Sequence, residues 1–312
     1  MSEKFYYDWI NTKKISPIVI TGIGQGIIRR IFEALTLERY DLIWIHRQTV
    51  PVFHKFFDRL FENSKIPIVF DMDDAVFTEY PIDILLRSSV GATVGNQYLA
   101  RYVETVAPNL NILVLPTVLD TKYYTSILKD ASKKPVVGWI GSSATFKRYL
   151  LPILDDIMYV CRSSEATLEI IASPDTAEAV QRAGAIFIPW SLESELIALQ
   201  NFDIGLMPLD NDNYSLGKCA FKLIEYGAVG IPSIGTRIGA NEEVITDGIT
   251  GYLTDDLSEM QDRLKSLISD FNLRCEMGLA ARRKIEVQYS LESKTNTLAV
   301  YFRQILENHA KF

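Results

Sequence analysis

Residues 217–232 read GKCAFKLIEYGAVGIP and predict a helix that runs directly into a strand. The helix is expected to begin near Gly217, and Gly230 and Pro232 mark its end. Residues 232–234 follow and are expected to form a short strand buried on both faces. A helix that leads into a buried strand is the repeating unit of a parallel sheet.

Short runs rich in Val and Ile alternate with amphipathic stretches of helical length along the rest of the chain. This alternation predicts an α/β fold of two doubly wound, Rossmann-like units in tandem, with helices covering parallel strands. The expected strands are residues 18–21, 42–45, 66–70, 92–94 and 112–115 in the first unit, and residues 136–140, 168–172, 186–188, 204–206, 232–234 and 252–253 in the second.

A length of 312 residues is sufficient for two domains of ordinary size. Residues 116–135 contain two prolines and a polar run, so they are predicted to hold the junction. We expect one domain at residues 1–125, a second at 126–290, and a C-terminal helix at 291–312 that packs back on the first domain or on the second. A ligand shared by the domains would lie at the carboxyl ends of strands.

The composition excludes several classes of protein. With 48% hydrophobic and 23% charged residues, the chain is expected to be globular. A net charge of -7 and the lack of a basic run argue against a nucleic-acid partner. Three widely separated cysteines argue against disulfides and zinc, and we expect neither a signal peptide nor a membrane span. These features favour the cytosol, with peripheral attachment to the inner face of the membrane left open.

Three charged side chains are expected on one face of the 217–230 helix, because Lys218, Lys222 and Glu225 lie at positions i, i+4 and i+7. A helix dipole disfavours cations near the N-terminus, so two lysines there indicate a bound anion. A diphosphate fits, since backbone N–H groups and ammonium groups both bind it, and Glu225 would then accept hydrogen bonds from ribose hydroxyls. The alternative is a solvated helix face with an ion pair between Lys222 and Glu225.

Further motifs give the sequence a resemblance to a known family. They are FDIGLMPL at 202–209, IPS at 231–233, GANEEVI at 239–245 and DGITGY at 247–252. With the 217–230 helix, they resemble the C-terminal nucleotide-sugar domain of group 1, retaining GT-B glycosyltransferases. GNQYL at 95–99 and PTVLD at 116–120 are similar to the end of the family's N-terminal domain and to the crossing between domains.

The resemblance implies two domains facing across a cleft, with the acceptor on the N-terminal side and the donor on the C-terminal side. It implies transfer of a sugar from a nucleoside diphosphate, UDP or GDP, to a hydroxyl of a glycan, a lipid-linked molecule or a small molecule. The transfer would retain the anomeric configuration through front-face displacement, with no metal and no cofactor.

The resemblance also assigns residues to the donor. GWIGS at 138–142 is similar to the phosphate-side strand and loop, residues 188–190 fall in the base-binding region, and Glu225 matches the second Glu of an E-x7-E motif. Gly217 stands where the first Glu belongs, so Asp212 or main-chain groups near Gly217 are expected to hold the donor sugar. The expected donor-binding residues are Gly141, Ser142, Ser143, Lys147, Arg148, Ile188, Trp190, Gly217, Lys218, Lys222 and Glu225.

Three carboxylates, Asp71, Asp73 and Asp74, follow the strand expected at 66–70, a position that favours a functional role. Three chemistries compete for them. The first is a Mg-dependent phosphohydrolase or phosphotransferase with Asp71 as nucleophile and Asp73 as acid, although Ala75 replaces its usual Thr; the second is a D-x-D metal site. The third, which we favour, is the D-x-D-D segment of the glycosyltransferase acceptor domain. A nucleotide-sugar binder without catalysis is a further alternative.

On this interpretation Lys218, Lys222, Asp73, Asp74 and His46 are the expected catalytic residues. Arg47, Asp71 and Gly24 are the expected acceptor-side residues. His46 and Arg47 directly follow an expected strand, whereas Gly24 lies in a glycine-rich loop expected after residues 18–21, where Ile27 breaks the dinucleotide fingerprint.

A stripe of apolar residues at helical spacing lies between the first expected strands. Core packing is favoured for it over attachment to a membrane. The stripe consists of Phe53, Phe56, Phe57, Leu60 and Phe61.

Overall fold

A computed structural model describes residues 17–49, 58, 59, 61, 62 and 64–309. The chain divides into two compact units. The first comprises Met1–Met72, Val76–Val114 and Val300–Phe312, and the second comprises Asp73–Ala75 and Leu115–Ala299. The division therefore falls after Val114 instead of after residue 125, and the C-terminal helix is divided between the two units.

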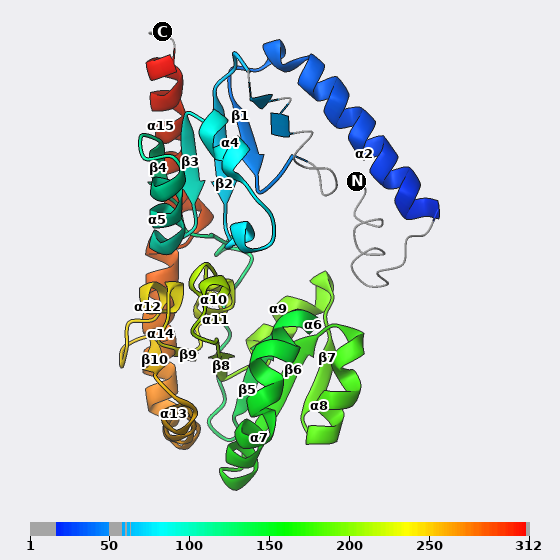
Figure 1. The fold of residues 1–312 in the computed structure, drawn as a ribbon. Coiled ribbons are helices and arrows are strands. Elements are labelled where there is room, and N and C mark those ends of the chain that lie inside the picture. The colour runs from blue at the N-terminus through cyan, green and yellow to red at the C-terminus, as the bar shows by residue number, and fades with distance from the viewer. Residues whose placement is uncertain (1–16, 50–57, 60, 63, 310–312) are drawn as a thin grey trace. The chain divides into compact units, whose positions relative to one another are not determined.

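The second unit contains a parallel sheet of six strands in the order β10-β9-β8-β5-β6-β7 (Figure 1). The sequence analysis expected all six, and their observed ends lie within two residues of the expected ends. This order runs outward in both directions from β5 and β8, as in a doubly wound sheet. The strands are β5 (Val136–Ile140), β6 (Thr167–Ala172), β7 (Ile186–Pro189), β8 (Ile204–Met207), β9 (Ser233–Thr236) and β10 (Gly251–Thr254).

Helices connect these strands or follow the last of them. Before β8 they are α6 (Ser143–Thr145), η3 (Phe146–Leu150), η4 (Leu151–Ile153), α7 (Leu154–Ser163), η5 (Pro174–Thr176), α8 (Ala177–Ala183) and α9 (Leu192–Asn201). After β8 they are α10 (Asn213–Leu216), α11 (Phe221–Ala228), α12 (Ala240–Val244), α13 (Leu257–Ser269) and α14 (Phe271–Gln288).

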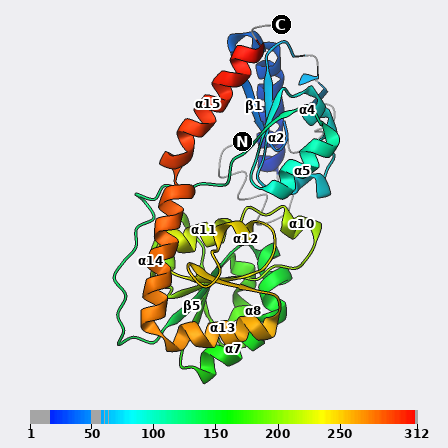
Figure 2. The ribbon, with the colours of Figure 1, turned by 90° about the vertical axis from the view of Figure 1, so that its left-hand side faces the viewer.

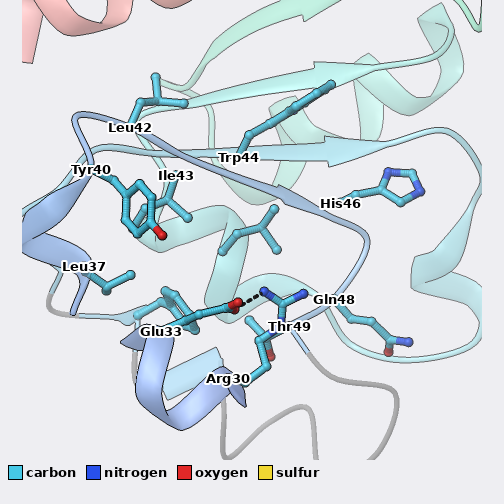
Figure 3. Close-up of a pocket in the computed structure, with 12 residues that line it drawn as sticks. Arg30, Glu33, Leu37, Tyr40, Leu42, Ile43, Trp44, His46, Gln48 and Thr49 are labelled. Carbon is cyan, nitrogen blue, oxygen red and sulfur yellow. Dashed lines mark hydrogen bonds and ion pairs between the residues drawn. The ribbon is translucent and has the colours of Figure 1, made fainter. Parts of the chain in front are cut away.

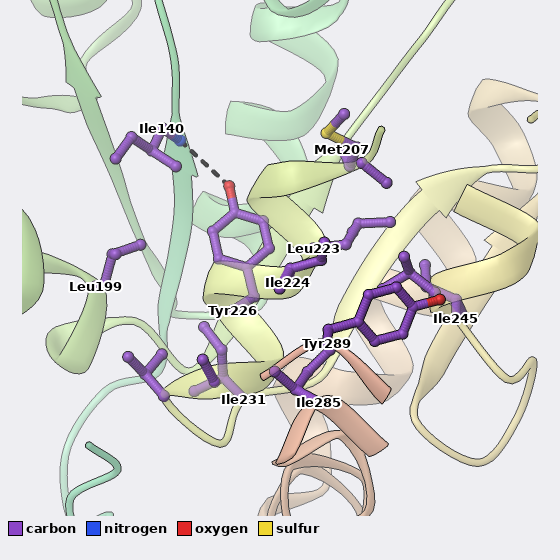
Figure 4. Close-up of a cluster of buried hydrophobic side chains, with 14 of the residues drawn as sticks. Ile140, Leu199, Met207, Leu223, Ile224, Tyr226, Ile231, Ile245, Ile285 and Tyr289 are labelled. Atoms are coloured by element: carbon purple, nitrogen blue, oxygen red, sulfur yellow. Dashed lines mark hydrogen bonds between the residues drawn. The ribbon is translucent and has the colours of Figure 1, made fainter. Parts of the chain in front are cut away.

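Two hydrophobic clusters cover the faces of the six-stranded sheet. Alternate residues of a strand point to opposite faces, so Trp139 joins the cluster with α7 and α13, whereas Ile140 joins the cluster with α11 and α14. Figure 4 shows the second cluster around Tyr226 of α11. A side chain on Gly205 would overlap the Tyr226 ring, so this glycine lets α11 approach the sheet closely.

The first unit contains four parallel strands in the order β1-β2-β3-β4, all four of which were expected. The strands are β1 (Ile43–His46), β2 (Ile68–Met72), β3 (Gly91–Val94) and β4 (Asn111–Val114), and the helices among the described residues are α2 (Pro17–Leu35), η1 (Leu37–Arg39), η2 (Val76–Thr78), α4 (Asp83–Ser88), α5 (Gln97–Val106) and the end of α15 (Leu291–His309).

The end of α15 packs on the four-stranded sheet (Figure 2). Tyr301 and Ile305 contact Val69, and the Tyr301 hydroxyl donates a hydrogen bond to the Asn111 carbonyl at 2.7 Å. Tyr301 and Ile305 of α15 are thus part of the core of the first unit.

The strand expected at residues 18–21 is wrong, because this segment lies in α2. The β-branched run at 18–20 indicated a strand, but apolar residues at 20, 23, 27 and 31 continue at helical spacing and govern the structure. Gly24 consequently lies within a helix and not in a loop after a strand. Phe53, Phe56, Phe57 and Leu60 lie outside the described residues, and Phe61 is buried.

No helix among the described residues combines the length and the hydropathy that crossing a bilayer requires.

Candidate functional site

The six-stranded sheet opens at the place where its strand order reverses. β5 and β8 pair only at Val137–Ile204 and Gly138–Gly205. Beyond these pairs the Tyr226 hydroxyl accepts a hydrogen bond from Ile140 N (Figure 4). The same hydroxyl donates to the Leu206 carbonyl at 3.2 Å. Ligands of open α/β sheets bind outside the carboxyl ends of the strands at such a reversal. The segments that follow β5 and β8 are therefore the expected place of a ligand site.

The segment after β5 is a tight turn into a short helix. Ser142 caps α6 by accepting a hydrogen bond from Thr145 N, and Gly141 has no room for a side chain beside Trp139. The Ser143 hydroxyl donates to the Asp175 carboxylate, which lies in η5 after β6. The three residues that the sequence assigned to the phosphate side therefore form one ordered turn at the end of β5.

Lys147 and Arg148 follow this turn, and both carry acidic partners. Lys147 forms an ion pair with Asp175 at 2.8 Å. Arg148 forms one with Asp212 at 2.5 Å, and its guanidinium also lies over the Tyr214 ring, 5.4 Å from the centroid. Asp175 and Tyr214 were not predicted, because each meets its partner only through tertiary packing. The charges of Lys147 and Arg148 are thus already balanced in this structure.

Lys218 does not lie on the helix that carries Lys222. The helix predicted from Gly217 is interrupted: α10 ends at Leu216, and α11 begins at Phe221 after Ala220, whose φ of 53° is left-handed. The Lys218 ammonium lies 4.4 Å from the centroid of the Tyr214 ring. The expected stripe of three residues on one helix is therefore wrong, and only Lys222 and Glu225 share α11.

Lys222 is half-buried and points toward the sheet. Its ammonium lies 5.4 Å from the centroid of the Trp139 ring, and it forms no ion pair with Glu225. Burial, with repulsion from Lys218 as the next cause, lowers the pKa of Lys222 to about 8. The alternative of a solvated Lys222–Glu225 pair is thus wrong, and α11 presents a desolvated cation at the end of β5.

Glu225 is a buried carboxyl group, only 3% exposed. Its pKa is raised well above the usual value, first by burial and then by the nearby Glu195 carboxylate. Within the described part of the chain, no group donates a hydrogen bond to this carboxyl. A buried acid without a donor is costly in the free protein and is the kind of group that a ligand's hydroxyls would satisfy.

Each oxygen of the Glu195 carboxylate accepts a hydrogen bond. This carboxylate in α9 accepts a hydrogen bond from the Tyr124 hydroxyl at 2.7 Å and another from the Trp190 indole N–H. Glu195 is 8% exposed, whereas the Trp190 side chain is 37% exposed. Ile188 is half-buried at the end of β7. Sequence reasoning placed Ile188 and Trp190 near the ligand but missed Glu195 and Tyr124, which are separated by 71 positions.

Gly217 is enclosed by residues of the second unit. A Cβ at this position would overlap Ala75, so the glutamate that the E-x7-E motif would place here does not fit. Asp212 does not lie free to replace it, because one oxygen caps α10 and the other pairs with Arg148. Asp73 and Asp74 lie in the same unit: the Asp73 carbonyl accepts from the Cys219 thiol, and Asp74 acts electrostatically on Lys222.

In the first unit, His46 and Asp71 are register partners on β1 and β2. The His46 ring nitrogen Nδ1 lies 2.6 Å from one Asp71 oxygen, and Thr93 donates a hydrogen bond to the other. Trp44 in turn donates to Thr93 at 3.0 Å. Arg47 adopts a left-handed φ of 60° directly after the strand. Paired strands thus bring His46 and Asp71 together at one end of the sheet.

A pocket of about 550 Å³ lies between α2 and β1 (Figure 3). Its lining includes His46, the Trp44 ring and the Arg30–Glu33 ion pair, which measures 2.7 Å. Its volume suits a small organic ligand. Across the described ranges, no three His, Cys, Asp or Glu side chains gather as they would around a metal ion.

Comparisons with known proteins agree on one family. Residues 134–270 match the family model described as "Glycosyl transferases group 1". N-acetyl-alpha-D-glucosaminyl L-malate synthase of Bacillus anthracis is 31% identical over an alignment of 331 residues. The alignment covers 97% of this chain and 85% of that protein.

Solved structures share the fold. The structure of Anabaena HepE in complex with UDP and glucose aligns with a TM-score of 0.65 and 13% identity, covering 88% of this chain and 81% of that one. Sucrose-phosphate synthase from Thermosynechococcus elongatus aligns with a TM-score of 0.69 and 13% identity, covering 89% and 77%. Two parallel-sheet α/β units of the GT-B type are therefore common to these chains.

Proposed function

We propose, given that the chain belongs to the group 1 glycosyl transferase family, that it moves a sugar from a nucleoside diphosphate to a hydroxyl acceptor, with retention and without a metal. The observation that carries the donor proposal is the pair on α11, a desolvated Lys222 and a buried Glu225 without a donor, at the reversal between β5 and β8. UDP is the first nucleotide to test, because UDP is bound in the HepE structure.

The diphosphate is proposed to lie against Lys222 and Lys218, with the turn Gly141–Ser143 on its other side. Negative charge grows on the leaving diphosphate as the glycosidic bond breaks. Fixed ammonium groups in a partly desolvated site stabilise that charge more in the transition state than in the ground state. In this proposal they take the place of a divalent cation, and activity is expected to persist in EDTA.

The nucleoside is proposed to lie between Glu225 and Trp190. The Glu225 carboxyl binds the ribose hydroxyls, and the exposed part of the Trp190 ring contacts the base. The acceptor is proposed to bind in the first unit, where His46 and Asp71 line one end of the sheet. A small hydroxylated acid is one acceptor to test, since the Bacillus anthracis relative is named for L-malate. The phosphohydrolase alternative loses support, because family membership favours glycosyl transfer.

Replacing Glu225 with alanine tests the donor site. The variant is expected to weaken UDP binding by about 1–3 kcal/mol, since the ribose loses a buried hydrogen-bonding partner. Its affinity for inorganic pyrophosphate is expected to be unchanged. Isothermal titration calorimetry of both ligands measures the difference.

The matched control is Glu276→Ala, which removes an exposed carboxylate of α14. It should leave both affinities as they are. A wild-type protein that binds neither UDP nor GDP would contradict the proposed function. Tight nucleotide binding without turnover over a panel of sugars and acceptors would favour a binder without catalysis.

The affinity for diphosphate is expected to fall at high pH. Lys222, whose pKa is about 8, is protonated in the free protein at pH 7 and loses its proton above pH 8. A bound diphosphate favours the ammonium and raises this pKa, so binding above pH 8 takes up a proton, and the affinity falls by up to about tenfold per pH unit. Titrations between pH 7 and 9.5, in buffers of different ionisation enthalpy, measure the uptake. A flat profile would exclude Lys222 from the diphosphate site.

A further inference from the structure

The carboxylate of Glu195 connects three parts of the second unit that lie far apart in the sequence. It stands in the first half of α9, accepts from Tyr124 in the segment before β5, and accepts from Trp190 in the loop after β7. It also acts electrostatically on Glu225 of α11. Glu195 therefore contacts Trp190, which the proposed function places at the base. It also lies near Glu225, which the proposed function places at the ribose.

Burying this carboxylate has a cost that its two hydrogen bonds offset. Glu195 is 8% exposed, although Glu193 in the same turn of the helix is exposed to solvent. A leucine at position 195 would pack about as well as the buried glutamate does. Its distinguishing property is therefore that it accepts from Trp190 and Tyr124 at once.

The bond to Trp190 restricts the orientation of a partly exposed ring. Trp190 follows β7 directly, and its backbone N–H donates to the Ala172 carbonyl, so the main chain is already fixed. The side chain still has two rotatable bonds, and the bond from its indole N–H to Glu195 selects one arrangement. An indole held in this way presents a preformed face to a flat ligand, and binding then loses less side-chain entropy.

We propose that Glu195 is a positioning residue of the donor site, which holds the Trp190 ring in place for the nucleobase and keeps Tyr124 beside Glu225. This inference rests on the proposed function. Glu195 itself touches no reacting atom. Its effect is on recognition of the nucleoside and not on the diphosphate, which is bound at the other end of the site by Lys222.

The test compares Glu195→Leu, Glu195→Gln and the matched control Glu193→Leu. Leucine keeps the volume and removes both acceptors. Glutamine keeps an acceptor for Trp190, and its amide can donate to the Tyr124 oxygen, so it rescues the geometry without the charge. We expect Glu195→Leu to raise the KM for the nucleotide sugar and the Kd for UDP by about tenfold or more, with kcat changed by less than about threefold. Glu195→Gln and Glu193→Leu should stay within about threefold of the wild type in all three quantities.

Binding of inorganic pyrophosphate distinguishes a positioning role of Glu195 from a general loss of structure in the site. The Kd for pyrophosphate is expected to be the same in all variants. In a Trp190→Ala background, Glu195→Leu should weaken UDP by a smaller factor than it does in the wild type, because only its effect through Tyr124 remains. If Glu195→Leu does not fold, Trp190→Phe, which keeps a smaller aromatic ring and removes the N–H that donates to Glu195, should weaken UDP by itself.

Equal UDP affinity in the wild type and Glu195→Leu would overturn this inference and leave the proposed function intact. Loss of pyrophosphate binding together with UDP binding would also overturn it, since that pattern indicates a collapsed site. A wild-type protein that binds pyrophosphate but neither UDP nor GDP would overturn both proposals.

Discussion

Lys222→Met is expected to lower kcat/KM for sugar transfer by about 10²–10³-fold, because it removes a preorganised cation from the place where charge develops on the leaving diphosphate. The melting temperature should not fall. Burial and Lys218 already disfavour the Lys222 ammonium, and methionine is apolar and similar in length. Initial rates with saturating acceptor and a thermal melt of the same sample measure both effects.

The unfolding free energy gives an independent check on Lys222. Its pKa is about 8 in the folded protein against 10.5 as the ordinary value, so the unfolded chain binds more protons between these pH values. The contribution of Lys222 to stability therefore rises with pH from about 8 to 10.5 and is constant below pH 8. Lys222→Met should remove this slope.

Lys265→Met is the control, because Lys265 lies on the exposed face of α13 and pairs with Asp262 at 3.0 Å. It should change neither rate nor stability. A Lys222→Met enzyme that keeps a third of its activity would exclude Lys222 from a role at the leaving group.

Arg282→Leu is expected to destabilise the second unit by about 3–5 kcal/mol. The Arg282 guanidinium donates to the carbonyls of Tyr124 and Ala228, and to that of Thr121 at 2.7 Å. Ala228 is the last residue of α11, where a cation also meets the negative end of the helix dipole. Removing the guanidinium leaves these carbonyls without their donor. Urea unfolding followed by circular dichroism measures the loss.

The neighbouring residue supplies the matched control. Arg283 is exposed on the same helix, so Arg283→Leu should change the unfolding free energy by no more than about 0.5 kcal/mol. Equal stability of the two variants would contradict the role of Arg282 in tying residues 121–124 to α11.

The strands were predictable because a buried parallel strand leaves a local pattern. Runs such as Val136–Ile140 and Ile204–Met207 are apolar on both faces, and this property needs no knowledge of distant residues. The same rule failed at residues 18–21. Four β-branched residues there favour a strand locally, but the helical spacing over the next dozen positions outweighs them.

The site was predictable only in part. Glu225 and Lys222 share a helix, so their spacing alone brought them together. The break before that helix depends on a left-handed Ala220, and alanine carries no sequence signal for that conformation. Arg148–Asp212 and Tyr124–Glu195 lie 64 and 71 positions apart, so these pairs exist only once the sheet has formed.

The division of α15 between the units has a consequence for synthesis. Tyr301 and Ile305 cover Val69 in the first unit, yet they are translated after the whole second unit. Since domains fold in the order in which they leave the ribosome, the N-terminal sheet must wait, with an uncovered apolar face, until the end of α15 emerges. A premature stop codon before Tyr301 would therefore destabilise the first unit, although all the strands of that unit had been translated.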